Sequence, residues 1–303
     1  MTPLKVGLAL GGGGARGIAH IGVLKVLESE GIHLHMISGT SFGSIVGAMY
    51  AQNPAIGQLK DRVLSFLKSE AFRRTKIFFI KRHYEEKKNK SFMTNIKNYL
   101  QQGIFWGISL QRTSFISEDV FLAQMGLLLE DKKIEDSVIP FIAVATDLTN
   151  GAEVVLSEGP IRTAVAASCA IPGVLPPIHV NGIQLIDGGW VNQVPVEPLE
   201  ARGVDFVIAV NISEEASETP EIFDSGLDVV LRANEITRCV LSHRQLSGVD
   251  FTIRPNIGHI HWSDFWRFDE AIQKGEEAAR AAIKPLKQLL WRKRVKKFIT
   301  ISQ

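Results

Sequence analysis

Cysteine is scarce in this chain of 303 residues, which contains two, Cys169 and Cys239. Two isolated cysteines give neither a disulfide framework nor the clustered spacing of a metal site, so we expect a reducing compartment and no metal. No stretch of about 20 uncharged apolar residues is present, so no membrane-spanning helix is expected. The N-terminal apolar run is too short for a secretion signal. These absences predict a cytoplasmic protein, soluble or bound peripherally at the inner membrane face.

The charge of the chain is nearly balanced, with a formal net charge of +2. A hydrophobic content of 45% and a charged content of 22% are ordinary for a globular protein with a large core. Strand and helix patterns alternate, which predicts an α/β fold with a mostly parallel sheet sandwiched by helices. The predicted strands are 4–10, 34–38, 139–146, 152–157, 183–186, 205–211 and 250–254. The main predicted helices are 15–30, 42–52, 55–69, 116–129, 160–167, 221–246 and 266–283.

The stretch GGGGARG at 11–17 lies between a predicted strand and a predicted helix. Free backbone amides and a helix N-terminus attract negative charge, so the stretch suits a phosphate cradle or an oxyanion hole. A dinucleotide site needs an acidic residue after a second strand, whereas Glu28 and Glu30 come too early. A P-loop needs Lys before Ser or Thr, whereas Gly17 precedes Ile18. A tight turn without a ligand is the third interpretation.

The second glycine motif, GTSFG at 39–43, also has a predicted strand before it and a helix after it. This context is typical of a nucleophile elbow, which exposes Ser41 at its apex. A serine nucleophile needs a base, and the ester oxyanion needs hydrogen-bond donors. Gly13 and Gly14 can supply these donors if the two preceding strands are neighbours, because their ends then meet at one edge of the sheet.

Two kinds of base are compatible with the sequence. A triad in the order serine, acid, histidine could use His259 or His261, although neither lies in a recognisable motif. The alternative is DGGWVNQVP at 187–195, where Asp187 follows a predicted strand and precedes two glycines. A desolvated carboxylate can take the serine proton directly, whereas a turn aspartate only caps its own backbone. The residues alone leave both bases open.

Three blocks, GGGGARG, GTSFG and DGG, occur in the order that is characteristic of the patatin-like phospholipase family. Within that family the chain resembles the bacterial relatives of neuropathy target esterase. ATDLTNG at 145–151 and ASCAIPG at 167–173 also look like blocks of the family. The resemblance covers roughly residues 4–212, and it implies a patatin-like α/β fold and hydrolysis of lipid acyl esters.

The resemblance implies a Ser–Asp dyad that needs no catalytic histidine, metal or organic cofactor. Ser41 is the implied nucleophile and Asp187 the implied base. The implied oxyanion-hole residues are Gly12, Gly13, Gly14 and Arg16, of which Gly12 lets the loop turn and Arg16 fixes it. The supporting motif glycines are Gly17, Gly39, Gly43, Gly188 and Gly189. One departure is Ala166, because relatives often carry Arg before the Ala-Ser pair of the ASCAIPG block.

The implied catalytic domain covers 1–212, with 70–115 as a lid or acyl-channel insertion, and a helical part, 213–303, packs on the same domain. Two basic segments, 73–90 and 284–298, mix cationic and apolar residues. That mixture suits contact with an anionic membrane, and it equally suits a helix docked on the domain with a solvated basic face. No nucleic-acid-binding module accompanies either segment, so nucleic acid is not an expected partner.

We therefore expect a serine acyl hydrolase whose substrate is a phospholipid or lysophospholipid ester. Two other classes stay open: a nucleotide-binding protein that uses residues 11–17, and a membrane-associated scaffold without turnover. Cys169 lies beside Ser168 in the ASCAIPG turn and is expected to be buried structure.

Overall fold

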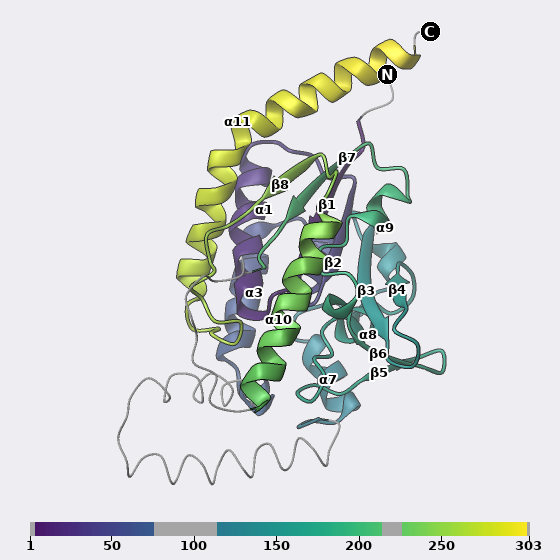
Figure 1. Ribbon diagram of the computed structural model, residues 1–303, viewed down its shortest axis with the longest axis vertical. Coiled ribbons are helices and arrows are strands. Elements are labelled where there is room, and N and C mark those ends of the chain that lie inside the picture. Colours follow the sequence, from purple (N-terminus) through teal and green to yellow (C-terminus); the bar gives the residue numbers. More distant parts are fainter. Residues whose placement is uncertain (1–3, 76–113, 214–225, 302–303) are drawn as a thin grey trace.

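One twisted sheet organises the part of the chain that the computed structural model describes, namely residues 4–75, 114–213 and 226–301 (Figure 1). Its strands are β1 (Val6–Leu10), β2 (Met36–Thr40), β3 (Phe141–Asp147), β4 (Glu153–Leu156), β5 (Ile178–Val180), β6 (Ile183–Asp187), β7 (Phe206–Val210) and β8 (Phe251–Ile253). The strand order is β5-β6-β3-β2-β1-β7-β8, and β4 pairs with β3. Neighbouring strands in the series β3-β2-β1-β7-β8 pair in parallel. By contrast, β4 and β6 each pair antiparallel with β3, and β5 pairs antiparallel with β6. The mostly parallel sheet expected from the sequence is confirmed.

Helices cover both faces of the sheet. They are α1 (Ala19–Ser29), α2 (Phe42–Gln52), α3 (Ile56–Lys68), α4 (Glu70–Arg74), α7 (Glu118–Met125), α8 (Ile161–Ser168), α9 (Glu197–Glu200), α10 (Gly226–Gln245) and α11 (Phe268–Ile301). The larger hydrophobic core joins one face of the sheet to α1, α2, α3, α8 and α11. A smaller core on the other face includes Ala9, Val144 and Ala209 of the sheet and Leu199 and Leu246 of the covering segments. The chain thus forms the expected helix–sheet–helix sandwich (Figure 1).

α1 and α11 lie side by side behind the sheet, although they are about 250 residues apart in the chain (Figure 1). Their backbones approach closely at two glycines. A Cβ on Gly22 would collide with the Ile272 carbonyl, and a Cβ on Gly275 would collide with the Ala19 carbonyl. The C-terminal part of the chain is therefore packed tightly against the first helix of the sandwich.

α11 corrects the prediction of a helix that ends at residue 283. The helix continues through Pro285 to Ile301 and changes direction along its length, as a proline inside a helix commonly causes (Figure 1). Leu286 and Leu290 are buried against the domain, and this packing outweighs the hydrogen bond that the proline removes. The basic segment 284–298 is thus the second half of one long helix.

Smaller differences from the prediction concern single elements. The predicted helix at 15–30 begins as a 3-10 turn, η1 (Gly14–Ile18), before α1 starts. The short β5 and α9 were not predicted, because three or four residues carry too little periodicity to be recognised. Most of the suggested insertion at 70–115 and most of the basic segment 73–90 lie outside the described residues.

The division into two parts at residue 212 stays a prediction. β8, α10 and α11 all come from 213–303, and β8 extends the same sheet by pairing with β7. Among the described helices, none combines the length and the apolar character that crossing a bilayer requires.

Candidate active site

The glycine loop and Ser41 leave the sheet from neighbouring strands. β1 and β2 pair in parallel, with Leu10 opposite Gly39, so both chains emerge at the same edge. A Cβ added to Gly12 would lie 3.3 Å from the Ser41 Cβ, which shows how closely the loop passes the serine. The neighbouring strands that the sequence required are therefore present.

Ser41 occupies a sharp turn between β2 and α2. Its backbone has φ 54° and ψ −127°, a region that side chains rarely adopt. The turn is possible because strand and helix touch at their glycines. A Cβ on Gly39 would lie 2.6 Å from the Gly43 carbonyl oxygen, and one on Gly43 would collide with the Leu10 carbonyl. This geometry is that of a nucleophile elbow, and the side chain at its apex is 5% exposed.

Asp187 reaches Ser41 from the other side. It ends β6 and lies opposite Ala145 of β3, and the Ser41 side chain is close enough to its carboxylate to affect its pKa. The Gly189 amide donates to its Oδ1 at 2.8 Å. Burial raises the pKa of Asp187 above its ordinary value, against the opposing effects of the nearby Arg238 charge, of the Ser41 side chain and of the hydrogen bond from Gly189. A buried carboxylate next to a serine hydroxyl is suited to accept its proton.

The ASCAIPG block at 167–173 forms hydrogen bonds with the backbones of both Ser41 and Asp187. The Ser168 hydroxyl accepts a hydrogen bond from the Ser41 amide at 3.0 Å, and the Ala170 carbonyl accepts one from the Asp187 amide at 3.0 Å. Cys169 between them is buried, as expected, and burial raises the pKa of its thiol. Ala166 is fully buried within α8. The sequence identified this block but not its role as a common support.

The glycines of the loop are enclosed by protein rather than left open. A Cβ on Gly13 would lie 2.8 Å from Ile212 Cδ1, and one on Gly14 would collide with the Trp262 carbonyl. Gly14 also has φ +56°, a conformation that favours glycine. The loop therefore needs its glycines for packing within the protein.

The loop amides differ in what they bind. The amides of Gly11, Gly12 and Ala15 donate to the carbonyls of Val210, Gln193 and Trp262. Across the described ranges, by contrast, no protein acceptor takes the amides of Gly13 or Gly14. These two amides are the ones expected to bind an oxyanion, whereas the Gly12 amide is already committed.

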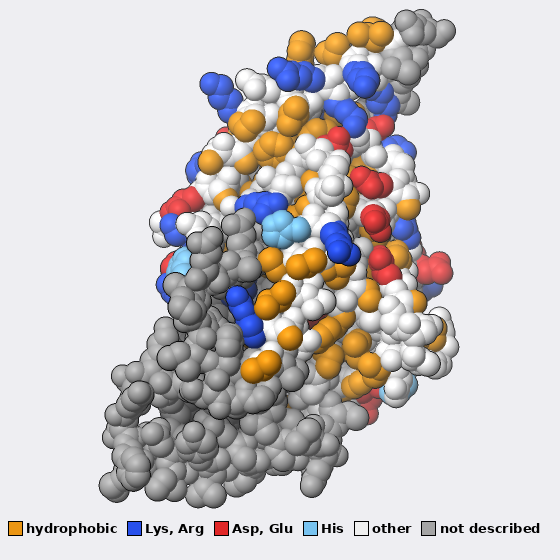
Figure 2. Space-filling view, in the orientation of Figure 1, with side chains coloured by type: hydrophobic (Ala, Val, Ile, Leu, Met, Phe, Trp, Pro, Cys, Tyr) orange, Lys and Arg blue, Asp and Glu red, His pale blue; other side chains and the backbone are white. Residues whose placement is uncertain are grey.

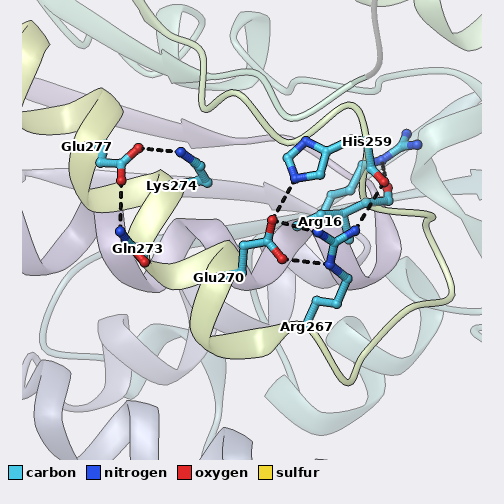
Figure 3. Close-up of polar contacts among 8 residues, drawn as sticks. Arg16, His259, Arg267, Glu270, Gln273, Lys274 and Glu277 are labelled. Carbon is cyan, nitrogen blue, oxygen red and sulfur yellow. Dashed lines mark hydrogen bonds and ion pairs between the residues drawn. The ribbon is translucent and has the colours of Figure 1, made fainter.

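A segment after β8 clamps the loop from outside. The buried Arg16 donates from Nε to the Ile260 carbonyl at 2.6 Å, and this contact joins the loop to the segment after β8 (Figure 3). His259 contacts Glu270 at 2.7 Å, and Glu270 also pairs with Arg267 (Figure 3). His261 contacts the Ser263 hydroxyl at 2.8 Å. These contacts of His259 and His261 do not involve Ser41, whereas Asp187 adjoins it, so the geometry favours the aspartate as base.

The remaining motif glycines pack around these residues. A Cβ on Gly17 would lie 2.7 Å from Phe42 Cβ, and one on Gly188 would collide with the Val144 carbonyl. Gly189 has no room either, because a Cβ would lie 2.7 Å from Gln193 Oε1. Within the described ranges, no group of three His, Cys, Asp or Glu side chains could hold a metal ion.

Gln193 and Arg238 are the site residues that the sequence argument missed. The Gln193 amide nitrogen donates to the Gly12 carbonyl at 2.6 Å, and its oxygen accepts from Arg238 Nε and Nη2 at 3.3 and 3.2 Å. Gln193 lies in the quoted DGGWVNQVP stretch, where its proximity to the glycine loop was not visible. Arg238 comes from α10 and belongs to no motif.

Comparison with known proteins supplies independent evidence. Residues 8–200 match the model of the family described as patatin-like phospholipase. Lysophospholipase NTE1 of Saccharomyces cerevisiae is 31% identical over 223 residues, which cover 74% of this chain and 12% of that protein. Patatin-like phospholipase domain-containing protein 6 of Homo sapiens is 31% identical over 217 residues, which cover 71% of this chain and 14% of that protein. The chain thus spans less than a fifth of the length of these relatives.

Among solved structures, VipD from Legionella pneumophila is similar with a TM-score of 0.49 and 17% identity, covering 95% of this chain and 66% of that one. The family match covers well over half of the present chain, and it includes the glycine loop, the serine elbow and the DGG turn. The chain therefore belongs to the patatin-like phospholipase family.

Proposed function

We propose that the protein is a serine acyl hydrolase that cleaves acyl esters of phospholipids or lysophospholipids with Ser41 and Asp187. The observation that carries this proposal is the proximity of the Ser41 side chain, at the apex of a strained elbow, to the buried carboxyl group of Asp187. The family match and the similarity to lysophospholipases support a lipid ester as substrate. They also favour a hydrolase over the nucleotide-binding alternative.

The proposed reaction has two halves. Ser41 Oγ attacks the ester carbonyl carbon while its proton moves to Asp187, and the tetrahedral intermediate collapses as Asp187 returns that proton to the leaving alcohol. Water then attacks the acyl-enzyme and gives a proton to Asp187. The second intermediate collapses to the free fatty acid, and the proton returns to Ser41 Oγ.

The negative charge of each intermediate needs donors that are already oriented. The amides of Gly13 and Gly14 suit this role, because the described protein leaves them without an acceptor. Arg16 and the Trp262 carbonyl hold the loop that carries them. A fixed donor loses little energy in reorganisation, and one such donor contributes on the order of 10²–10³ in rate.

Release of fatty acid from a lysophospholipid tests the proposal. The purified protein should hydrolyse this ester without added metal or nucleotide, and the Ser41→Ala and Asp187→Asn variants should not. Equal release by wild type and Ser41→Ala would contradict the proposed chemistry. No release by the wild-type protein from any lipid ester would favour the non-catalytic scaffold instead.

We propose in addition that the protein is cytoplasmic and contacts the inner, anionic membrane face through the second half of α11. Trp291, Val295, Phe298 and Ile299 are exposed there, at a spacing that places them on one face of the helix. The exposed Arg292 and Arg294 flank this stripe, and Figure 2 shows hydrophobic and cationic side chains side by side at this end of the molecule. An apolar stripe with cations beside it complements an anionic lipid surface.

This surface lies far from Ser41, so we propose that it attaches the protein to the membrane and is not part of the path by which substrate reaches the site. We call this membrane contact the tether. Lys293 and Lys297 bind Asp250 and Asp205 at 2.9 and 2.6 Å, and these aspartates precede β8 and β7. Ser41 lies at the opposite, carboxyl end of the parallel strands, and a strand of five residues is roughly 17 Å long. Catalysis on a soluble ester should therefore be independent of this contact.

Sedimentation with vesicles of increasing phosphatidylglycerol content tests the tether. Replacing Arg292 and Arg294 by Gln should weaken binding about 30-fold, at about 1 kcal/mol per cation. Lys293 and Lys297 are kept because they hold the helix to the domain. The matched control replaces Arg280 and Lys284, exposed cations that precede Pro285 on the same helix. Equal binding of the two variants and wild type would contradict the tether.

A further inference from the structure

Arg238 brings a positive charge to the edge of the proposed catalytic centre. It lies on α10, outside the 8–200 range of the family match. A Cβ placed on Gly189 would lie 3.1 Å from Asp187 Oδ1 and 3.4 Å from Arg238 Nη2, so the carboxylate and the guanidinium adjoin the same glycine. The charge is close enough to oppose the rise in the pKa of Asp187.

The guanidinium has more donors than its protein contacts use. Arginine carries five N–H groups, and the described contacts of Arg238 are two hydrogen bonds to one neutral oxygen, Gln193 Oε1. In the described part of the chain, Arg238 forms no ion pair with a carboxylate, whereas Arg232 on the same helix pairs with Glu235 at 3.2 Å. Arg238 is also half-buried. A half-buried cation that has unused N–H groups and forms no ion pair among the described residues, with Asp187 near but not paired to it, is suited to an anionic ligand.

Gln193 fixes the guanidinium relative to the nucleophile. Its side chain is held by the Gly12 carbonyl at 2.6 Å, and a Cβ on Gly12 would lie 3.4 Å from Gln193 Oε1 and 3.3 Å from Ser41 Cβ. The cation is therefore separated from Ser41 by the width of one glycine and one amide group. A substrate whose ester carbonyl reaches Ser41 can place a neighbouring anionic group at Arg238.

We propose that Arg238 binds the phosphate of the substrate and thereby selects acyl esters that carry a phosphodiester over neutral glycerides. The inference rests on the proposed lipid acyl hydrolysis at Ser41. A guanidinium offers two parallel N–H groups to two phosphate oxygens, and Gln193 leaves its outer N–H groups available for this contact. In a glycerol-based lysophospholipid, three carbons separate the ester oxygen from the phosphate oxygen, so the phosphate stays close to the ester that reaches Ser41.

A structural role for Arg238 makes a different prediction. If the residue acted only by holding Gln193 and the glycine loop, or only by keeping Asp187 ionised, its loss would affect every ester alike. A phosphate-binding residue affects esters that carry phosphate and spares those that do not. The choice of substrate therefore separates the two roles.

The experiment compares a lysophosphatidylcholine with the monoacylglycerol of the same acyl chain, both in neutral detergent micelles. The Arg238→Gln variant should lose about 10- to 100-fold in kcat/KM on the phospholipid, the factor expected for a hydrogen-bonded charge, and less than about threefold on the monoacylglycerol. Arg238→Lys should recover part of the loss, because it keeps the charge but not the planar fork. Arg244→Gln, an exposed cation on the same helix, should leave both substrates unchanged.

Inhibition by glycerol 3-phosphate provides a second readout. This ion should compete with lysophospholipid in the wild-type protein, and its inhibition constant should rise about tenfold or more in Arg238→Gln. Equal losses on the two esters, or no loss on either, would overturn the phosphate assignment while leaving ester hydrolysis by Ser41 intact. Absence of hydrolysis of both esters by the wild-type protein would instead contradict the proposed function itself.

Discussion

The Ser41 amide donates a hydrogen bond to the Ser168 hydroxyl over 3.0 Å, and this bond joins the strained elbow to the end of α8. Both residues are buried, so the amide has no water to replace a lost partner. The bond offsets part of the cost of the φ of 54° at Ser41, which is about 1–3 kcal/mol for such a conformation. Ser168 is therefore a positioning residue for the proposed nucleophile.

Ser168→Ala should lower both stability and turnover. We expect a loss of about 1–3 kcal/mol in the free energy of unfolding, because a buried donor is left unpaired. A relaxed elbow should also reduce kcat by about 10- to 100-fold on a soluble ester. The control is Ser242→Ala, which removes a buried hydroxyl bonded to the Cys239 carbonyl at 2.8 Å and should leave kcat unchanged. Unchanged kcat in Ser168→Ala would contradict the positioning role.

Asp187 should set the acid limit of activity. The proposed base must be ionised, and burial raises its pKa above the ordinary value, so kcat/KM should fall as pH decreases at a higher pH than for an exposed aspartate. The measurement is a pH profile of kcat/KM on a soluble ester. Asp187→Asn should be nearly as inactive as Ser41→Ala, while His259→Ala and His261→Ala keep the wild-type profile. If a histidine variant abolishes turnover while Asp187→Asn stays active, the result would contradict the dyad and support a serine–acid–histidine triad.

Gly14→Ala should lower the stability of the protein much more than an alanine at another glycine with a similar φ. Gly31 has φ +67° with no atom within 4 Å of an added Cβ, so Gly31→Ala costs only the left-handed conformation, about 1–2 kcal/mol. At Gly14, φ +56°, the same methyl group would also collide with the Trp262 carbonyl. Denaturant unfolding should show the larger loss for Gly14→Ala, accompanied by a fall in kcat of roughly 10²–10³. Equal stability losses would show that the loop adjusts freely.

His20 should make the protein sensitive to acid. It is fully buried, its Nε2 bonds the Gly11 carbonyl at 2.8 Å, and its Nδ1 has no partner in the described structure. Burial lowers its pKa from 6.5 to about 4. Above pH 6.5 the ring is neutral in both states, whereas below it the unfolded chain takes up a proton that the folded chain resists. The free energy of unfolding should thus fall by about 3 kcal/mol between pH 6.5 and 4, at 1.36 kcal/mol per unit.

The contribution of His20 is isolated by comparison with His20→Gln, since acidic groups also titrate in this range. The glutamine amide can still donate to the Gly11 carbonyl but takes up no proton. The difference in unfolding free energy between the two proteins should therefore change with pH below 6.5 and stay constant above it. A constant difference over the whole range would mean that His20 takes up its proton equally well in the folded and the unfolded protein, which contradicts a lowered pKa.

Those parts of the site that depend on short motifs were predictable from the sequence. Each glycine motif follows a strand and precedes a helix, so the local chain places Ser41 and the loop at strand ends, and the pairing of β1 with β2 brings them together. Asp187 was recognised by its glycines, although it arrives on an antiparallel strand. The fold class followed from the alternation of strands and helices.

Contacts between distant segments were not predictable in the same way. Arg238 approaches Gly189 because α10 lies in front of the sheet (Figure 1), and no local sequence pattern encodes that placement. The Trp262 carbonyl beside Gly14 is a backbone group, for which the residue type carries no signal. The continuation of α11 through Pro285 depends on the buried Leu286 and Leu290, whereas local propensity predicts an end there.

Covalent labelling of Ser41 is the most direct test of the proposed chemistry. A fluorophosphonate probe should modify the purified protein at one serine, identified as Ser41 by peptide mass spectrometry, with loss of ester hydrolysis in proportion to labelling. Ser41→Ala should take up no probe, and Asp187→Asn should react far more slowly, because the hydroxyl then has no base. Labelling of another serine, or full ester hydrolysis by a protein labelled at Ser41, would contradict the assignment of Ser41 as the nucleophile.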